Sequence, residues 1–201
     1  MITHNKDGQL LFPDEYCKVN NIGPLTDKDC FQQIEGDTLS IEEYFKQNFS
    51  KFKFDCRPDF NVWSSHDFST EEINKLINEN KTLTEINQLL KISHCLIMKV
   101  NKNSWVAWHY DYPKKGPVIN LLLTTKGKSH SLFTYNIPDT SNLIECKYQP
   151  NQFFLYNTEI LHSILNFEET RYIFSVIFEK GQQDNLKWEE AKNILKKYIV
   201  N

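Results

Sequence analysis

Arginine is scarce in this sequence of 201 residues, where it occurs only at Arg57 and Arg171. Lysine therefore supplies nearly all the positive charge, and Lys plus Arg total 23 against 26 for Asp plus Glu. The formal net charge of -3 leaves no general basic surface to neutralise phosphates, which disfavours nucleic acid as a partner. An arginine in such a lysine-rich chain indicates a position that needs the forked guanidinium.

Long apolar runs are also missing. The longest stretches, such as 118–123, fall far short of the roughly 20 residues that a membrane-spanning helix needs, so we expect no membrane span. The first residues lack the apolar core and cleavage site of a secretory signal. The five cysteines show neither close pairs nor metal-type spacing, and their odd number cannot all pair within the chain. We expect a cytoplasmic protein with reduced thiols.

The sequence does contain enough apolar residues to enclose one sizeable core. Apolar residues make up 40% and aromatic residues 13% of the chain, and no linker-like segment or charge block marks a domain boundary. We predict a single domain over 1–201. Residues 1–92 are expected to supply supporting strands and helices, 93–180 the β-rich core, and 181–201 a C-terminal helix that covers a sheet.

Three hydroxyl residues, each followed three positions later by glutamate, predict helix starts in the first half of the chain. The pairs are Ser40 with Glu43, Ser69 with Glu72, and Thr82 with Glu85. The helix that begins near Ser69 is expected to break near Asn80, where the next one starts. Amphipathic helices thus precede the β-rich core.

From about residue 94 the apolar period changes from helical to alternating or continuous, in short runs rich in β-branched and aromatic residues. The predicted strands are His94–Asn101, Ser104–Tyr112, Val118–Thr125, Ser129–Asn136, Leu143–Tyr148, Gln152–Asn157, Ile160–Asn166 and Thr170–Glu179. Many short strands at regular spacing predict an all-β barrel or sandwich, with the earlier helices packed outside it.

A histidine and an aspartate stand at alternate positions of the segment 105–112. On a strand, His109 and Asp111 share one face, which period-2 alternation also assigns to Trp105. Divalent iron with open coordination positions prefers two histidines and one carboxylate. His162, on a later predicted strand, supplies the second histidine if the sandwich closes.

Arg171 comes nine residues after His162, at the start of the last predicted strand. Alternation places it on one face with Ser175, so its guanidinium could bind a carboxylate bidentately inside the same cavity. A cation beside a metal suits a dicarboxylate cosubstrate. The alternative for Arg171 is a surface ion pair with Glu168 or Glu169.

The ordered set His109-x-Asp111, His162 and Arg171 resembles the motif of the iron(II)- and 2-oxoglutarate-dependent oxygenases, over roughly residues 93–180. The resemblance implies an all-β core with flanking helices, the core being a double-stranded β-helix, or jelly roll. It implies that His109, Asp111 and His162 bind Fe(II), and that Arg171 binds the distal carboxylate of 2-oxoglutarate. It further implies an O2-dependent hydroxylase for an amino-acid, small-molecule or protein side-chain substrate, with release of succinate and CO2.

The same resemblance suggests further cosubstrate contacts. Some branches of the family carry a serine two residues after the arginine, but Ile173 stands there and Ser175 comes later. Other members use a tyrosine, asparagine or threonine on a core strand. Asn120 and Thr124 are expected to share one such face, and Tyr135 is the alternative. No catalytic side chain beyond the metal ligands is expected.

Two other functions fit the same pattern. A cupin-like metalloenzyme would use the triad without 2-oxoglutarate, and a non-catalytic jelly-roll binding module would carry it incidentally. The remaining histidines, at positions 4, 66, 94 and 130, are not expected to bind metal. Phosphate-binding glycine loops, serine nucleophile elbows and Cys-His nucleophile patterns are not evident.

Overall fold

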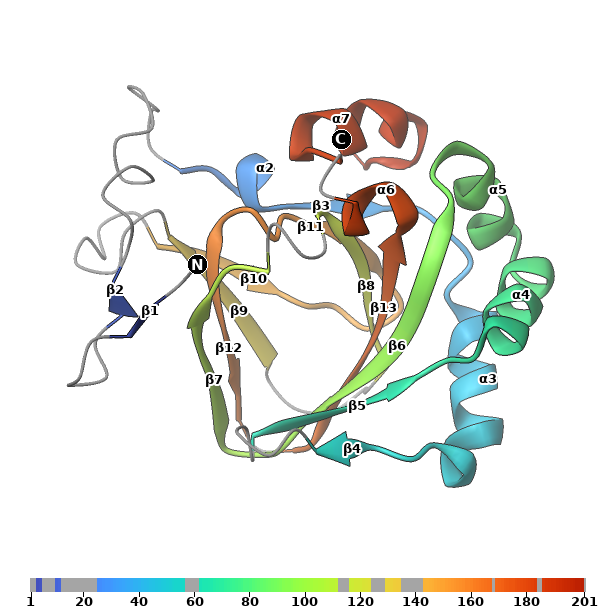
Figure 1. Cartoon of the computed structure of the whole chain (residues 1–201), viewed down its shortest axis with the longest axis horizontal. Helices are drawn as coiled ribbons and strands as arrows, with labels where there is room; N and C mark the ends of the chain where they lie inside the picture. The colour runs from blue at the N-terminus through green and yellow to red at the C-terminus, as the bar shows by residue number, and fades with distance from the viewer. Residues whose placement is uncertain are drawn as a thin grey trace.

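Two β-sheets face one another in this protein, and helices cover the outer side of the larger sheet (Figure 1). The computed structural model describes residues 3–4, 10–11, 25–56, 62–111, 116–123, 129–134, 143–167, 169–183 and 186–200. Statements about the fold and the site refer to these residues.

The strands are numbered in the order of the chain. They are β1 (Thr3–His4), β2 (Leu10–Leu11), β3 (Phe31–Ile34), β4 (Asp55–Cys56), β5 (Trp63–Asp67), β6 (Ile92–Val100), β7 (Ser104–His109), β8 (Val118–Leu122), β9 (Ser129–Thr134), β10 (Ile144–Lys147), β11 (Phe153–Tyr156), β12 (Leu161–Asn166) and β13 (Arg171–Phe178). The helices are α2 (Asp27–Cys30), α3 (Leu39–Asn48), α4 (Thr70–Glu79), α5 (Lys81–Leu89), α6 (Glu179–Gln182) and α7 (Trp188–Ile194), with 3-10 turns η1 (Phe49–Lys51) and η3 (Lys196–Tyr198).

Strands β6 to β13 are divided between the two facing sheets as in a jelly roll, and the consecutive strands β9 and β10 are neighbours in the smaller sheet. The smaller sheet has the order β10-β9-β12-β7, and the larger one contains β11-β8-β13-β6 in its middle. Their pairings are all antiparallel. The eight predicted strands are therefore confirmed, and so is the all-β core with flanking helices. Most strand ends are shorter than predicted by a few residues, but β6 begins at Ile92, two residues before the predicted His94.

Segments before the jelly roll extend the larger sheet at both edges. Strand β3 pairs with β11 at one edge, while β5 and β4 continue the sheet beyond β6 at the other. Helices α3, α4 and α5 lie along the outer side of this sheet (Figure 1). Strands β3 and β5 thus share backbone hydrogen bonds with the core strands β11 and β6.

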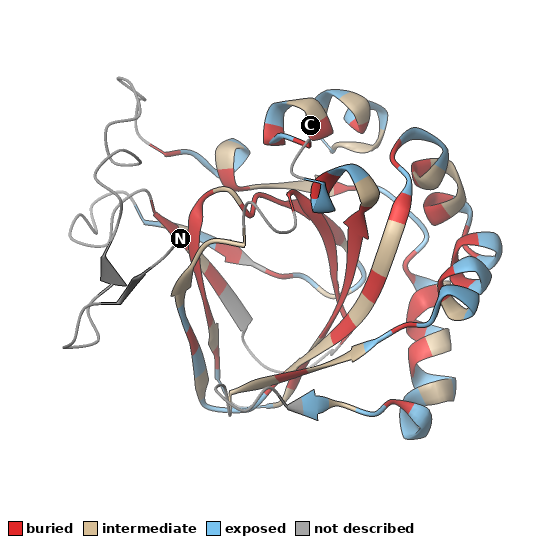
Figure 2. Cartoon of the chain, viewed as in Figure 1, coloured by how far each residue is buried: buried red, intermediate tan, exposed pale blue. Residues whose placement is uncertain are grey.

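Strand β13 shows why the larger sheet is buried on both faces (Figure 2). Phe174 and Val176 belong to the apolar cluster under the helices. Ile173 and Ile177, which alternate with them, belong to a second cluster between the two sheets. Strands enclosed on both faces carry continuous apolar runs, and the run in β13 is interrupted at the inner face only by Arg171 and Ser175.

The helix starts correct two of the three predicted caps. Helix α4 begins after Ser69, whose side chain and that of Glu72 form the reciprocal capping box, as predicted. Helix α3 begins earlier than its predicted cap Ser40, and α5 begins after Asn80. The prediction of Ser40 and Thr82 as caps is wrong, because Ser40 Oγ accepts from Asn80 Nδ2 and Thr82 Oγ1 accepts from the backbone of Asp37.

Replacing Ser69 with alanine is expected to lower the free energy of unfolding by about 1 kcal/mol, because the N-cap hydroxyl of α4 accepts from the backbone N–H of Glu72. Urea denaturation of Ser69→Ala measures the loss. Thr70→Ala, at the exposed next position, serves as the control and should change the stability less. Equal effects of the two substitutions would contradict the capping role.

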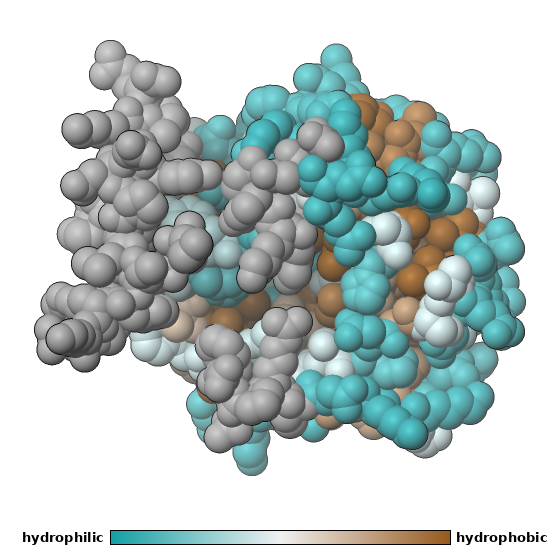
Figure 3. All heavy atoms as spheres, in the orientation of Figure 1, coloured by the Kyte–Doolittle hydropathy of each residue, from teal (hydrophilic) through white to brown (hydrophobic). Residues whose placement is uncertain are grey.

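Cys30, Cys95 and Cys146 are free thiols buried in the interior, as the sequence predicts for reduced cysteines. Burial raises the pKa of Cys95 and of Cys146 to about 12. None of the helices in the described ranges is long and apolar enough to cross a membrane. On the face drawn in Figure 3 the described surface is mainly hydrophilic, and apolar side chains come to the surface in small groups.

Candidate metal centre

A β-bulge in β7 turns His109 toward the space between the sheets. In the pairing of β7 with β12, His109 stands opposite His162, but the next partners are Val106 and Ile164. Two residues of β7 therefore oppose the single residue Ser163. The extra residue shifts the alternation, so His109 shares the inner face with the buried Val106.

The bulge corrects the prediction for Trp105. Strict alternation assigned Trp105 to the face of His109, yet its side chain is 53% exposed on the outer side of the smaller sheet. Its indole Nε1 donates to Ser163 Oγ at 2.6 Å. The alternation that places the predicted ligands on the inner face therefore starts at His109, after the bulge.

The triad predicted from the sequence comes together at one end of the smaller sheet. One ligand atom each of His109, Asp111 and His162 lies within 4.8 Å of the others. His162 Nε2 is 3.9 Å from Asp111 Oδ2, and the two imidazole centroids are 4.3 Å apart. His162 is almost fully buried, whereas His109 and Asp111 lie partly exposed at the edge of the site.

Both imidazoles are fixed in the tautomer that suits metal binding. His109 Nδ1 lies 2.7 Å from the carbonyl oxygen of Ala107, and His162 Nδ1 lies 2.8 Å from that of Ile160. A carbonyl oxygen only accepts, so each Nδ1 carries the hydrogen and each Nε2 keeps its lone pair. Two such nitrogens and a carboxylate form the donor set that divalent iron prefers.

Arg171 is the most deeply enclosed charged residue of the inner face, with 1% of its surface exposed. Its Nε, Nη1 and Nη2 atoms have no hydrogen-bond partner among the described residues. The guanidinium carbon lies 4.5 Å from the centroid of the Tyr148 ring. Burial lowers the pKa of Arg171, opposed by Tyr148, Tyr156 and Cys146. The surface ion pair considered from the sequence is therefore wrong for the described chain.

Two tyrosines connect the arginine with the triad. The Tyr156 ring packs edge-on against His162 at a centroid distance of 5.2 Å, and it stacks with Tyr148 at 6.4 Å. Burial raises the pKa of both hydroxyl groups, so they stay neutral beside Arg171 near pH 7. The buried space between the sheets thus offers one cation and no competing anion among these neighbours.

Asn120 and Ser175 lie beside this space and bind each other. Ser175 Oγ donates to Asn120 Oδ1 at 2.6 Å, and Asn120 Nδ2 donates to the Tyr148 hydroxyl at 3.0 Å. The hydroxyl hydrogen of Tyr148 is therefore not used in the bond to Asn120. Thr124 and Tyr135, the other two predicted contacts, lie outside the described residues.

Sequence reasoning missed Tyr148 and Tyr156. A signal was available, because Tyr148 lies two positions after Cys146 and Tyr156 lies two positions after Phe154. All four residues belong to the cluster between the sheets. Alternation groups such residues on one face. It does not say which face turns toward the metal.

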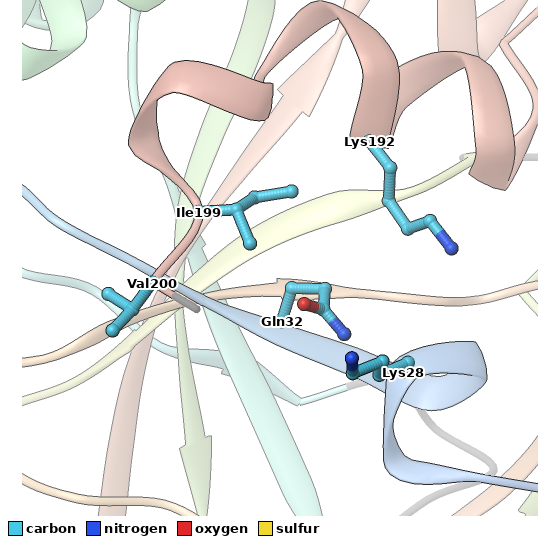
Figure 4. A pocket seen from close by; sticks show the side chains of 5 residues that line it. All are labelled: Lys28, Gln32, Lys192, Ile199 and Val200. Carbon is cyan, nitrogen blue, oxygen red and sulfur yellow. The ribbon is translucent and has the colours of Figure 1, made fainter.

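A surface hollow of about 240 Å³ lies elsewhere, between β3 and the C-terminal segment (Figure 4). Its lining includes Lys28, Gln32 and Lys192. None of the predicted site residues lines it, and it plays no part in the triad.

Several solved structures share this arrangement of strands. One is an oxidoreductase of the 2OG-Fe(II) oxygenase family from Burkholderia pseudomallei, 9% identical, with a TM-score of 0.52 over 74% of this chain and 82% of that chain. The fold is that of the iron(II)- and 2-oxoglutarate-dependent oxygenases.

Two further structures share this oxygenase fold. HygX from Streptomyces hygroscopicus with nickel and 2-oxoglutarate bound is 11% identical, with a TM-score of 0.56 over 76% of this chain and 83% of that chain. A prolyl-4-hydroxylase from Pseudomonas putida is 12% identical, with a TM-score of 0.53 over 75% of this chain and 92% of that chain. No family model and no curated protein matches the sequence.

Proposed function

We propose that this protein is an iron(II)- and 2-oxoglutarate-dependent oxygenase. In this proposal His109, Asp111 and His162 bind the metal, and Arg171 binds the distal carboxylate of 2-oxoglutarate. The observation that carries the proposal is the Arg171 guanidinium, whose three nitrogen atoms are buried and without hydrogen-bond partners in the described chain.

A buried charge without a partner is unfavourable by several kcal/mol. A carboxylate is the group that best removes this cost, because it accepts two parallel hydrogen bonds from a guanidinium. The ligand that carries this carboxylate should also bind the metal. A metal held by three protein ligands keeps coordination positions for further oxygen donors. A 2-oxo dicarboxylate supplies both a chelating end and a distal carboxylate.

Tyr148 is proposed as a second donor to that carboxylate. Asn120 donates to its hydroxyl oxygen, so the bond to Asn120 does not use the hydroxyl hydrogen, which is proposed to turn toward the anion beside Arg171 when the cosubstrate is bound. Ser175 holds Asn120 in place through Asn120 Oδ1. Asn120 and Ser175 are thus proposed to orient Tyr148, and the apolar residues around them exclude water from the anion.

When bound, Fe(II), 2-oxoglutarate and O2 supply the oxidising chemistry, with succinate and CO2 as products and hydroxylation of the substrate as the proposed outcome. The chain's own contribution is to orient and enclose. The Nδ1–H bonds to Ala107 and Ile160 hold the imidazoles. Tyr148 and Tyr156, both uncharged, are proposed to line the space between the two ends of the cosubstrate.

A small-molecule or protein side-chain substrate is proposed. Among the similar structures, one HygX structure contains hygromycin B, and another protein is a prolyl-4-hydroxylase. The epimerase SnoN has the same fold, with a TM-score of 0.53 and 11% identity, so the outcome at carbon needs its own assay. Gain of one oxygen atom by the substrate, read by mass spectrometry, would support hydroxylation.

We also propose that residues 1–201 form one domain. The pairing of β3 with β11 and of β5 with β6 supports this, because strands from the region before residue 93 thereby extend the sheet of the 93–180 core. Limited proteolysis followed by separation of the fragments would test it.

Anaerobic calorimetry of 2-oxoglutarate binding to the Mn(II)-loaded protein tests the function. We expect binding that requires the metal. Metal binding without any response to 2-oxoglutarate would favour the cupin-like enzyme instead. Absence of metal binding would favour the non-catalytic binding module and overturn the proposal.

A further inference from the structure

The bulge in β7 is bridged by a short chain of hydrogen bonds on the outer side of the smaller sheet. Ser163 Oγ donates to the carbonyl oxygen of Val106 at 2.8 Å, and Trp105 Nε1 donates to the same Ser163 Oγ at 2.6 Å. We propose that Ser163 and Trp105 are positioning residues for the metal ligand His109. This inference rests on the proposed metal site.

The position of the bulge gives these bonds their importance. Val106 is the last regularly paired residue of β7 before the bulge, and His109 is the first one after it. If the extra residue were lost from the register, the side chain of His109 would turn to the outer face with Trp105. Bulges near active sites redirect side chains in this way, and here the redirected side chain is a proposed ligand.

Ser163 is suited to hold the bulge because it stands opposite it on β12. Its side chain points away from the inner face, which its neighbours His162 and Ile164 occupy. Ser163 is fully buried although it lies on the outer side. A buried hydrogen bond that is lost leaves an unsatisfied carbonyl, which is costly, so the hydroxyl favours the bulged conformation.

Trp105 sets the direction of the Ser163 hydroxyl. An indole N–H only donates, so the serine oxygen must accept from Trp105 and its hydrogen is left for Val106. Although the indole ring is half exposed, its Nε1 atom therefore makes a specific hydrogen bond to the buried Ser163. A phenylalanine would keep the ring and lose the donor.

The bulge also supplies the carbonyl that fixes the tautomer of His109. Ala107 lies within the bulge, and its oxygen accepts from His109 Nδ1 at 2.7 Å. Loosening the bulge would thus disturb both the direction of the imidazole and the state of its Nε2 atom. His162 has an equivalent bond to Ile160, which precedes the paired part of β12, so the effect is specific for His109.

Titration of the apoprotein with Co(II), followed by its visible absorption under anaerobic conditions, tests the inference. Outer-shell contacts to metal ligands contribute roughly 10-fold to 100-fold to affinity. We expect Ser163→Ala to weaken Co(II) binding by a factor in this range and to change the spectrum, because one ligand is misplaced. Trp105→Phe, at a half-exposed position, should cause a smaller loss in the same direction.

Ser104→Ala is the matched control. Ser104 lies on the same strand and donates to the carbonyl oxygen of Asn101 at 2.5 Å, outside the bulge. Its substitution removes a serine-to-carbonyl bond that is local and exposed, and it should leave the Co(II) affinity and spectrum unchanged. Thermal unfolding of the apoproteins shows how much stability each variant loses.

The outcomes separate this inference from the proposed function. Failure of the unmodified protein to bind Co(II) would overturn both. Normal metal binding in which Ser163→Ala and Trp105→Phe retain the affinity and spectrum would overturn only the positioning role, as would an equal loss in Ser104→Ala. If Ser163→Ala does not fold, the Trp105→Phe titration alone decides.

Discussion

Replacing Arg171 with methionine is expected to weaken 2-oxoglutarate binding to the metal-loaded protein by roughly 30-fold to 4,000-fold. This range corresponds to about 2–5 kcal/mol, the cost of removing one partner of a buried, hydrogen-bonded charge pair. The side chain is 1% exposed and all three of its nitrogens are available to an anion. Arg171→Lys keeps the charge without the fork, and should fall between the two proteins.

The same substitution should stabilise the ligand-free protein. Without a bound anion, the Arg171 guanidinium is a buried cation whose described neighbours are tyrosine and cysteine side chains. Methionine fills a similar space with apolar atoms, so we expect the free energy of unfolding to rise by about 1–4 kcal/mol, the range for replacing buried ionic groups by well-packed apolar ones. Opposite signs for stability and binding would mark Arg171 as a residue kept for its ligand.

Calorimetry with 2-oxoglutarate and urea denaturation without it measure the two effects of Arg171→Met. Lys99→Met is the matched control, because Lys99 precedes Val100, the β6 residue paired with Arg171, and lies over the Phe54 ring on the other face. The control should leave cosubstrate affinity unchanged. An unchanged dissociation constant in Arg171→Met would show that the carboxylate binds elsewhere.

Substituting His162 with alanine should reduce the affinity for Mn(II) or Co(II) by more than the roughly 100-fold upper range of outer-shell changes. His162 is a proposed direct ligand, with its Nε2 3.9 Å from Asp111 Oδ2 and its Nδ1 held by the Ile160 carbonyl. Metal titration by calorimetry or absorption measures the change. Because His162 is buried, His109→Ala, at a partly exposed position, gives a second measurement that perturbs packing less.

His94→Ala provides a control for the histidine substitutions. His94 also contacts a carboxylate, with its Nε2 3.1 Å from Asp67 Oδ1, but it belongs to no described three-residue cluster with suitable ligand atoms. Its loss should leave metal affinity unchanged. If His94→Ala and His162→Ala weakened metal binding equally, the assignment of the triad would be wrong.

The predicted strands are confirmed because local patterns are decisive in this part of the chain. Short β-branched and aromatic runs, separated by turn residues, leave few alternatives to a strand. Helix α4 is likewise marked locally by Ser69 and Glu72. The caps at Ser40 and Thr82 fail for the opposite reason: their hydroxyls bind Asn80 and Asp37, more than 35 positions away in the chain.

The candidate site, too, was predictable where it depends on local sequence and unpredictable where it depends on contacts between distant strands. The sequence order of His109, Asp111, His162 and Arg171 was sufficient to predict the set and the jelly-roll fold by resemblance. It could not reveal that the Arg171 guanidinium has no hydrogen-bond partner among the described residues, since pairing depends on which side chains the other strands place around it. Tyr148 and Tyr156 enter the site for the same reason.

The sequence by itself determined the strands of the core, the all-β core with flanking helices, and the chemical identity of the candidate ligands, because each depends on local periodicity or residue chemistry. The tertiary structure decided which faces turn inward. A single extra residue opposite Ser163 reverses the alternation of β7, so that Trp105 lies outside and His109 inside. Register between strands arises from hydrogen bonds across distant parts of the chain, which local sequence does not record.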